Sequence, residues 1–176
     1  MPTVPPQLYP WYTVITGDEL QQGDIFESCS IFIPRTVEGP RALFDWEERD
    51  VVLMSQSCDL VKGREKLEEV LLSALWYRSE LPNSEHIATP KGLEEARKGY
   101  LPGFHLLAPS SEAGFERELR IVDFRRVYSL PISFVRQRAA RQQRLRILPP
   151  YREQLSQAFA RYFMRVGLPT DIPSFI

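Results

Sequence analysis

The sequence lacks several features that would assign the chain to common protein classes. No apolar run approaches the roughly 20 residues that a helix needs to cross a bilayer, so no membrane partner is expected. Two cysteines are too few for a disulfide framework. The first residues, MPTVPPQLYPWY, have no basic start followed by an apolar segment, as a secretory signal would. These absences predict a cytoplasmic protein with reduced thiols.

Histidine is equally scarce, which restricts metal and cofactor chemistry. The chain contains only two histidines and two cysteines, which are His86, His105, Cys29 and Cys58. These four residues formally make a Cys2His2 set, but most zinc sites carry a closely spaced ligand pair such as CxxC. No such pair is present. The sequence therefore predicts no metal site and no cofactor.

The chain does contain enough apolar sequence for one folded domain. Of its 176 residues, 43% are hydrophobic and 26% are charged, as in typical globular proteins. Residues 1–13 hold four prolines and three aromatic residues, and such proline density favours an extended surface tail. Residues 14–176 are predicted to form a single domain.

Charge is unevenly distributed along the chain, although the formal net charge is only −1. Residues 1–115 hold 10 Lys and Arg against 18 Asp and Glu, whereas residues 116–176 hold 12 arginines, no lysine and 5 acidic residues. The planar guanidinium group matches phosphate and carboxylate groups. The asymmetry predicts either a face for RNA or another polyanion, or a fold in which the two halves neutralise each other.

Five strands are predicted from apolar runs bounded by turn residues. Counting in twos from Ile25 gives one mostly apolar face, which consists of Ile25, Glu27, Cys29, Ile31 and Ile33. The consecutive apolar residues 51–54 are expected to be buried on both faces of a sheet. The expected strands lie within residues 25–33, 50–57, 67–77, 103–109 and 118–130, and residues 35–49 are expected to form a long loop.

Two helices are predicted. In the first, Thr89 is expected to be the N-cap, with Pro90 in the first turn and Gly99 as the stop. The second is expected over residues 150–166, with Pro150 at its start and Gly167 just beyond its end. Its apolar stripe consists of Tyr151, Leu155, Phe159, Tyr162 and Val166. The pattern predicts a mainly β, α+β domain, namely a small twisted β-barrel with a helical insertion and a C-terminal helix.

The order of these elements resembles the PemK/MazF-like family of SH3-like barrels. Gly23-Asp24 precedes the first strand, Val51 to Ser55 is similar to the family's buried strand that ends in serine, and RIVDFRRVYSL is similar to the strand that leads to its terminal helix. The resemblance covers about two thirds of the chain. It implies an SH3-like barrel and a role in a bacterial toxin–antitoxin or defence-type system.

The chain departs from this family at the positions that cleave RNA. RNA-cleaving members carry an arginine shortly before the buried strand, where this chain has Asp50 with Arg49 one step away. They also carry a threonine on the next strand, where this chain offers Ser73. The resemblance therefore implies a binding module for nucleic acid or a nucleotide, without ribonuclease catalysis.

The main candidate site is the cluster Ser-Gln-Ser-Cys-Asp, residues 55–59, which is similar to an SxxCD signature of uncharacterised bacterial proteins. One interpretation is a cysteine-dependent enzyme, in which Cys58 is the nucleophile, His105 the base and Asp59 the residue that orients the base. A second is a binding pocket and a third is a turn in which the polar side chains bond to backbone N–H groups. The residues expected to bind a ligand are Ser55, Gln56 and Ser57.

The arginine-rich segment 136–147 is the second candidate site. It could hold phosphates, with Phe124, Tyr128 and Phe134 stacking on bases, or it could be a solvated linker before the last helix. A protein partner that contacts the proline-rich tail or the terminal helix is a further alternative. The arginines expected to bind RNA are Arg125, Arg126, Arg138, Arg141 and Arg144.

Overall fold

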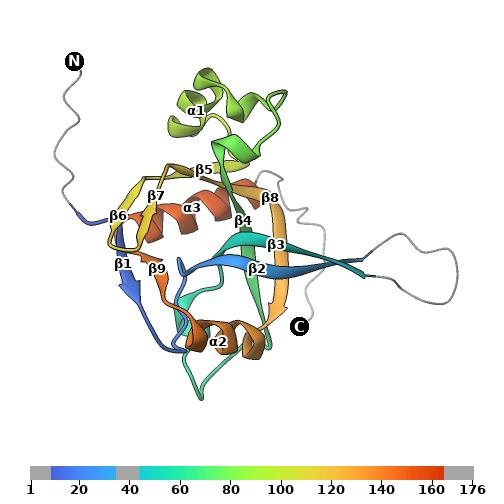
Figure 1. The fold of residues 1–176 in the computed structure, drawn as a ribbon, viewed down its shortest axis with the longest axis vertical. Helices are drawn as coiled ribbons and strands as arrows, with labels where there is room; N and C mark the ends of the chain where they lie inside the picture. Colours follow the sequence, from blue (N-terminus) through green and yellow to red (C-terminus); the bar gives the residue numbers. More distant parts are fainter. Residues whose placement is uncertain (1–8, 35–43, 165–176) are drawn as a thin grey trace, which may run out of the picture.

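The computed structural model describes residues 9–34 and 44–164, and its elements are drawn in Figure 1. The described chain is an α+β fold, as expected. Its strands are β1 (Tyr12–Ile15), β2 (Ile25–Pro34), β3 (Phe44–Leu53), β4 (Glu69–Tyr77), β5 (Phe104–Leu107), β6 (Ser110–Glu112), β7 (Phe115–Arg117), β8 (Arg120–Pro131) and β9 (Arg144–Ile147). Its helices are α1 (Pro90–Arg97), α2 (Ile132–Arg141) and α3 (Tyr151–Phe163), with short 3-10 turns η1 (Ser57–Asp59), η2 (Arg78–Glu80) and η3 (His86–Ala88).

The described strands form three antiparallel sheets rather than one closed barrel. The largest has the order β2-β3-β4-β8-β5, while β1 pairs with β9 and β6 pairs with β7. The five predicted strands correspond to the five members of the large sheet. The prediction missed β1, β6, β7 and β9, because strands of three or four residues are too short to show a periodic pattern.

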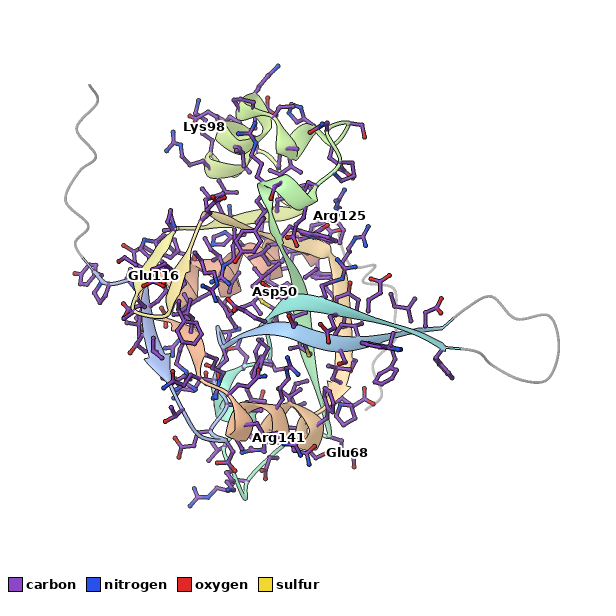
Figure 2. All side chains as sticks on the ribbon, viewed as in Figure 1. Asp50, Glu68, Lys98, Glu116, Arg125 and Arg141 are labelled. Carbon is purple, nitrogen blue, oxygen red and sulfur yellow. The ribbon has the colours of Figure 1, made fainter. Side chains whose placement is uncertain are left out.

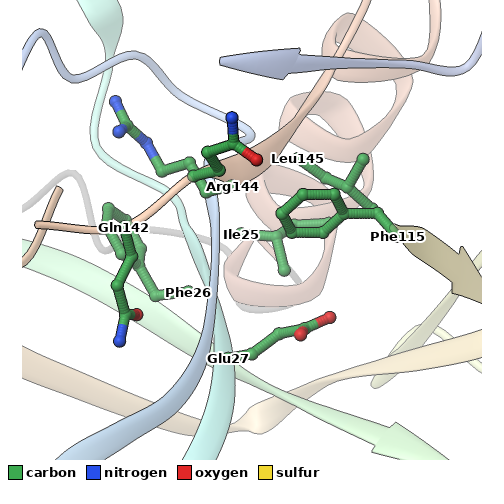
Figure 3. Close-up of a pocket in the computed structure, with 8 residues that line it drawn as sticks. Ile25, Phe26, Glu27, Phe115, Gln142, Arg144 and Leu145 are labelled. Carbon is green, nitrogen blue, oxygen red and sulfur yellow. The ribbon is translucent and has the colours of Figure 1, made fainter. Parts of the chain in front are cut away.

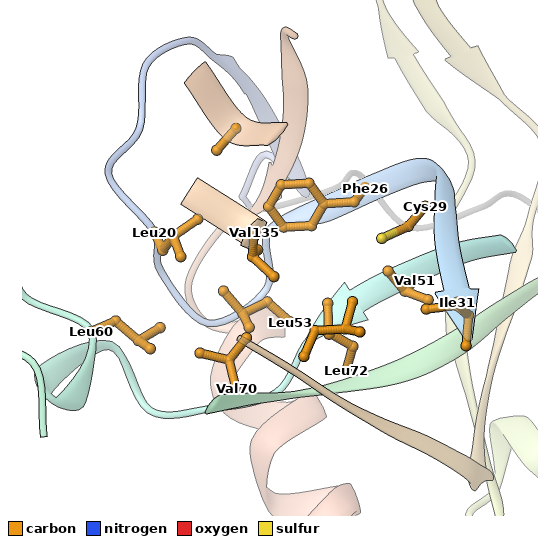
Figure 4. Packing of buried hydrophobic residues seen from close by; sticks show 12 residues of the cluster. Leu20, Phe26, Cys29, Ile31, Val51, Leu53, Leu60, Val70, Leu72 and Val135 are labelled. Carbon is orange, nitrogen blue, oxygen red and sulfur yellow. The ribbon is translucent and has the colours of Figure 1, made fainter. Parts of the chain in front are cut away.

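Strand β3 is buried on both faces where it crosses the sheet, which confirms the expectation for residues 51–54. Val51 and Leu53 belong to a core cluster that includes residues of α2, and Figure 4 shows Leu53 near Val135 of that helix and Val51 near Cys29 and Ile31. Val52 and Met54 face the opposite cluster, which is covered by α3 and by the β1–β9 pair. The strand is therefore enclosed between two layers.

Helix α3 docks on the second cluster through the expected stripe. Leu155 is fully buried, and the Phe159 and Tyr162 rings lie 5.4 and 6.2 Å from the Phe124 ring, between centroids. Tyr151 stacks on Trp11 at 3.6 Å. The expected helix end, with Val166 and Gly167, lies outside the described residues.

The alternation expected for β2 is interrupted by a bulge. The pairing register with β3 shifts between Phe26 and Cys29, and Ser28 between them has a φ of 49°. Phe26 and Cys29 consequently face the same core cluster, whereas Ile25 belongs to the opposite one. The count in twos from Ile25 was wrong because a bulge adds a residue to one strand of the pair.

The loop expected over residues 35–49 is in part a strand. Residues 44–49 belong to β3 and pair with β2, for example Trp46 with Phe32. Since β3 pairs with β4 only from Val51 to Leu53, the rest of the β2–β3 pair projects as a two-stranded arm (Figure 1). The β3 half of this arm resembles a loop in sequence because its residues 44–50 are exposed or only partly buried and are mostly polar. Residues 35–43 lie outside the described part of the chain.

Helix α1 begins and ends where the sequence predicted. The Thr89 hydroxyl accepts a hydrogen bond from the Gly92 N–H at 3.0 Å, and Gly99 beyond α1 has a φ of 77°, as predicted for the N-cap and the stop. Strand β1 includes Tyr12, a buried residue that the sequence assigned to the tail. The described residues include no helix that is both long and apolar enough to cross a membrane.

Candidate functional site

The Ser-Gln-Ser-Cys-Asp cluster forms a turn that is fastened to neighbouring segments. The Ser55 hydroxyl accepts a hydrogen bond from the Leu71 N–H at 2.9 Å, which ties the turn to β4. The Ser57 hydroxyl accepts one from the Gln22 N–H at 3.0 Å, which ties it to the segment before β2. These contacts support the interpretation that the two serines satisfy backbone groups. They also hold the remaining residues of the turn in place.

Cys58 is exposed on this turn, beside the ion pair of Asp59 and Lys66. Its Sγ lies 3.6 Å from the Asp59 carboxylate, which also pairs with Lys66 at 2.9 Å. The hydrogen bond from Lys66 holds the pKa of the Asp59 carboxyl below its usual range. The Cys58 thiol thus donates to a carboxylate, whereas the expected catalysis needs a histidine base at that thiol.

His105 does not complete the expected catalytic group. It lies on β5 with its ring 6.4 Å from that of Phe124, and burial lowers its pKa to about 4. Its Nε2 is buried and has no hydrogen-bond partner among the described residues. His105 and Cys58 line different depressions of the described surface. The geometry of the described residues therefore contains no Cys58–His105 pair.

The two cysteines are free thiols with different environments. Cys29 is buried in β2, where burial raises its pKa, while Cys58 is exposed. Within the part of the chain that the structure describes, no three His, Cys, Asp or Glu side chains are grouped closely enough to hold a metal ion.

Two of the arginines expected to bind RNA hold the fold together instead. Arg144 is only 3% exposed, and its Nε donates to the Asp24 carboxylate at 3.0 Å while its other nitrogens donate to backbone carbonyls. Arg138 donates to the backbone carbonyls of Glu27 and Ser28, at 2.6 Å each. These hydrogen bonds connect α2 to the β2 bulge. Their segment is part of α2 and β9 rather than a solvated linker.

The arginines of the second half pair widely with the carboxylates of the first half. This arrangement supports the alternative in which the two halves of the chain neutralise each other. The long-range pairs are Arg117–Glu27, Arg120–Glu27, Arg125–Glu85, Arg136–Glu65, Arg144–Asp24 and Arg146–Asp24.

The remaining three arginines are exposed, and two of them, Arg125 and Arg126, approach the same Asp123 carboxylate. Arg125 forms two hydrogen bonds with Asp123, at 2.9 and 3.0 Å, and lies over the Phe104 ring at 4.4 Å. Arg126 lies over the Trp76 ring at 5.2 Å. Figure 2 shows Arg125 in the upper half of the view and Arg141 on α2 near the bottom, so these two do not form one cluster. Phe124, expected to stack on bases, is 1% exposed and belongs to the core.

A polar groove runs along α3 and includes part of the predicted cluster. Its first depression, of about 360 Å³, contains the Cys58 turn, and its second, of about 270 Å³, contains His105. Gln157 lines both, so the two depressions adjoin at that side chain. We call them together the α3 groove, and the polar residues that line it are Gln22, Gln56, Ser57, Cys58, Arg97, Lys98, His105, Arg152, Glu153, Gln154, Ser156, Gln157 and Arg161.

The first depression of the α3 groove presents amide and hydroxyl groups. The Ser156 hydroxyl accepts hydrogen bonds from the side-chain amides of Gln22 and Gln56, at 3.4 and 3.2 Å. Because this oxygen accepts twice, its own hydrogen remains available for donation to a ligand. Arg152 adds a guanidinium that is paired with the adjacent Glu153 at 2.8 Å.

The second depression is cationic. Arg97 and Lys98 both pair with Glu94, at 2.7 and 3.2 Å, so these three side chains together carry one positive charge. Arg161 is exposed on α3 and adds another. The α3 groove was not predicted from the sequence. The sequence feature that could have indicated it is the spacing of four residues from Arg152 to Ser156 and from Gln157 to Arg161, which places each pair on one helix face.

No known protein-family model matches the chain, and no curated protein matches it in sequence.

Proposed function

We propose that this chain is a binding module for single-stranded RNA or a nucleotide, that the ligand lies in the α3 groove, and that the module does not cleave RNA. The observation that carries the proposal is the α3 groove itself, in which the exposed amides of Gln56 and Gln157 line one depression and the exposed Arg161 lines the adjoining one. Unpaired bases present donors and acceptors on their edges, which side-chain amides can match. Phosphates require the cations.

The absence of catalysis is supported by the chemistry of the groove. Metal-independent cleavage of RNA needs a base for the 2′-hydroxyl and a cation for the phosphate, both at one place. In the groove, burial lowers the pKa of His105 to about 4, and the Cys58 thiol donates to the Asp59 carboxylate rather than to a histidine. Asp50, which stands where the toxin-type enzymes carry a cation, accepts a hydrogen bond from the Ser28 N–H at 2.9 Å within the β2 bulge.

The kinship with PemK/MazF-like toxins forms part of the same proposal. We regard the five-stranded sheet, with its short β1–β9 companion and its docked C-terminal helix, as a divergent and open relative of the SH3-like barrel. The support is the order of the elements, in which a buried β3 is followed by a last long strand and a terminal helix. A shared fold would not by itself imply shared catalysis.

The proposal is tested with a fluorescein-labelled single-stranded RNA in an anisotropy titration at several salt concentrations. We expect measurable affinity that falls with salt. For single-stranded nucleic acid the slope of log K against log salt is about −0.7 per neutralised phosphate. Replacing Arg161 with Gln should weaken binding and make the slope less steep by about that amount.

The matched control is the same substitution at Arg141, an exposed arginine on α2 outside the groove. Arg141→Gln should leave both the affinity and the slope unchanged. Equal losses in the two variants would remove the α3 groove as the binding site, and no RNA affinity in the wild type at low salt would overturn the proposed function. Cleavage of a long RNA by the wild type, lost in Arg49→Ala, would restore a toxin-type activity.

A second candidate function, as an interaction subunit, is favoured by the β2–β3 arm. Phe32, Phe44 and Trp46 on this arm are 60%, 61% and 63% exposed. Large apolar side chains that remain this exposed on a projecting arm are characteristic of protein contacts. The test compares tagged wild type with a Phe32→Ser, Trp46→Ser variant purified from the native host. A stoichiometric partner present only with the wild type would support this function.

A further inference from the structure

Arg120 is the largest fully buried side chain of the described protein, at 0% exposure on β8. An arginine keeps its positive charge in a protein and carries five N–H donors, so a buried guanidinium normally has close acceptors. Within the described residues none of its three nitrogens meets the full geometry of a hydrogen bond, and its near neighbour there is the Tyr12 hydroxyl, which interacts with the guanidinium. Its single ion pair there is with Glu27, whose Oε1 lies 3.5 Å from Nη1. Arg120 therefore retains donors that could bind a further acceptor.

The surroundings of Arg120 are polar, although they lie inside the molecule. Tyr77 on β4 stands opposite Arg120 in the strand pairing. Burial raises the pKa of Tyr12 to about 12 and also raises that of Asp50, and the positive charge of Arg120 opposes both increases. Two tyrosines and two carboxyl groups thus lie within the electrostatic reach of one guanidinium, a combination more typical of a ligand site than of a core.

A second arginine lies on the outer side of the same carboxylate. Arg117 on β7 grips Glu27 with two hydrogen bonds of 2.7 Å each. The side chains of Arg117 and Glu27 are 26% and 30% exposed, whereas that of Arg120 is 1% exposed. Glu27 therefore lies between an outer and an inner guanidinium. One carboxylate, that of Glu27, is shared by two guanidinium groups, although each of these groups could bind a carboxylate of its own.

A surface depression of about 300 Å³ leads to Glu27. Ile25, Phe115 and Gln142 line it together with Glu27, and Figure 3 shows the Glu27 carboxyl group and the Phe115 ring on the same side of the β2 backbone. Phe115 and Arg117 belong to the β6–β7 hairpin, which pairs with no other strand in the described sheets. Arg120 lies behind Glu27 as seen from this depression, because its Nη1 is 3.5 Å from the Glu27 Oε1 while its own side chain is only 1% exposed.

We propose that Arg117 and Arg120 form a binding site for a small carboxylate anion, which enters by this depression and takes the place that Glu27 occupies between the two guanidinium groups. The planar guanidinium binds a carboxylate through two parallel hydrogen bonds, which selects this ligand class over a spherical anion. The nitrogens of Arg120 supply donors for the ligand. Glu27 acts as an internal competitor, because its own carboxylate must move for the ligand to bind.

The test uses Glu27→Gln, which removes the competing carboxylate and keeps the shape of the side chain. Sodium acetate is the probe, and the melting temperature is followed against sodium chloride at equal ionic strength. We expect a saturable rise with acetate and a dissociation constant at least about tenfold lower in Glu27→Gln than in the wild type, since the loss of charge-assisted hydrogen bonds to an internal carboxylate is worth that factor. Glu116→Gln, on the same strand β7, is the matched control and should bind acetate as the wild type does.

The wild type provides a second measurement that does not depend on the variant's folding. In a ¹⁵N-edited spectrum of arginine side chains, the Nε–H signals of Arg120 and Arg117 should shift with acetate and saturate, while chloride should leave them in place. Unshifted signals in the wild type would overturn the proposal, as would an equal response to acetate in Glu27→Gln and Glu116→Gln. A stronger response to inorganic phosphate than to acetate would overturn the assignment to a carboxylate.

Discussion

Replacement of Arg144 by Met should strongly destabilise the protein, although a charged segment of this composition would be expected on the surface. Arg144 is 3% exposed and its partner Asp24 is 0% exposed, with 3.0 Å between the Nε and the Oδ2. Its Nη atoms also donate to the carbonyls of Gly17, Ala139 and Glu19, at 2.8, 3.3 and 2.5 Å. Truncating one partner of a buried ion pair typically costs about 3 to 5 kcal/mol.

Arg146 is a second cation at this site, and its presence places the expected loss of stability toward the lower end of that range. Arg146 remains bound to Asp24, at 2.5 and 3.0 Å, so the buried carboxylate keeps one charge partner. We therefore expect a loss of about 3 kcal/mol in the free energy of unfolding, measured in urea. Arg141→Met, three residues earlier and exposed, should change it by less than about 0.5 kcal/mol.

The comparison between Arg144→Met and Arg141→Met separates a structural arginine from one at the surface. Equal and small losses in the two variants would refute the argument that Arg144 connects β9, the segment before β2 and the end of α2. Double replacement of Arg144 and Asp24 should cost less than the sum of the two single changes, because the two side chains interact directly.

Three further predictions concern the second core cluster and the thiols. Phe159→Ala should lower the free energy of unfolding by about 2 to 4 kcal/mol, since the ring is partly buried against Phe124, and a loss under 1 kcal/mol would remove it from the core. Iodoacetamide should alkylate Cys58 in the native protein while Cys29 is protected until unfolding, as mass spectrometry can show. Burial lowers the pKa of His105 to about 4, so the unfolded chain binds the extra proton between about pH 6.5 and 4, and stability is lost as the pH falls through that window, by on the order of 3 kcal/mol. In His105→Gln this part of the acid destabilisation should disappear, and an unchanged pH profile would contradict the buried, neutral histidine.

The sequence by itself determined the elements whose signals are local. The N-cap hydroxyl of Thr89 and the stop at Gly99 act within a few residues of α1, so their effect is readable without the fold. The stripe that docks α3 depends only on the helical repeat. Four consecutive apolar residues at 51–54 predicted a strand enclosed on both faces, and the two core clusters confirm it.

The tertiary structure alone decided what each polar side chain does. Arg141 and Arg144 are three residues apart in one basic segment, yet one is exposed and the other is buried against Asp24, 120 positions away in the sequence. The bulge of β2 and the β1–β9 pair likewise depend on distant partners. Charge composition states how many cations a segment has, but not which carboxylates will face them. Ion pairs form where folding brings opposite charges together, and this proximity arises from the packing of distant segments rather than from adjacency in the sequence. For the same reason, the α3 groove and the site around Arg120 became visible only once separate strands and helices had been placed side by side.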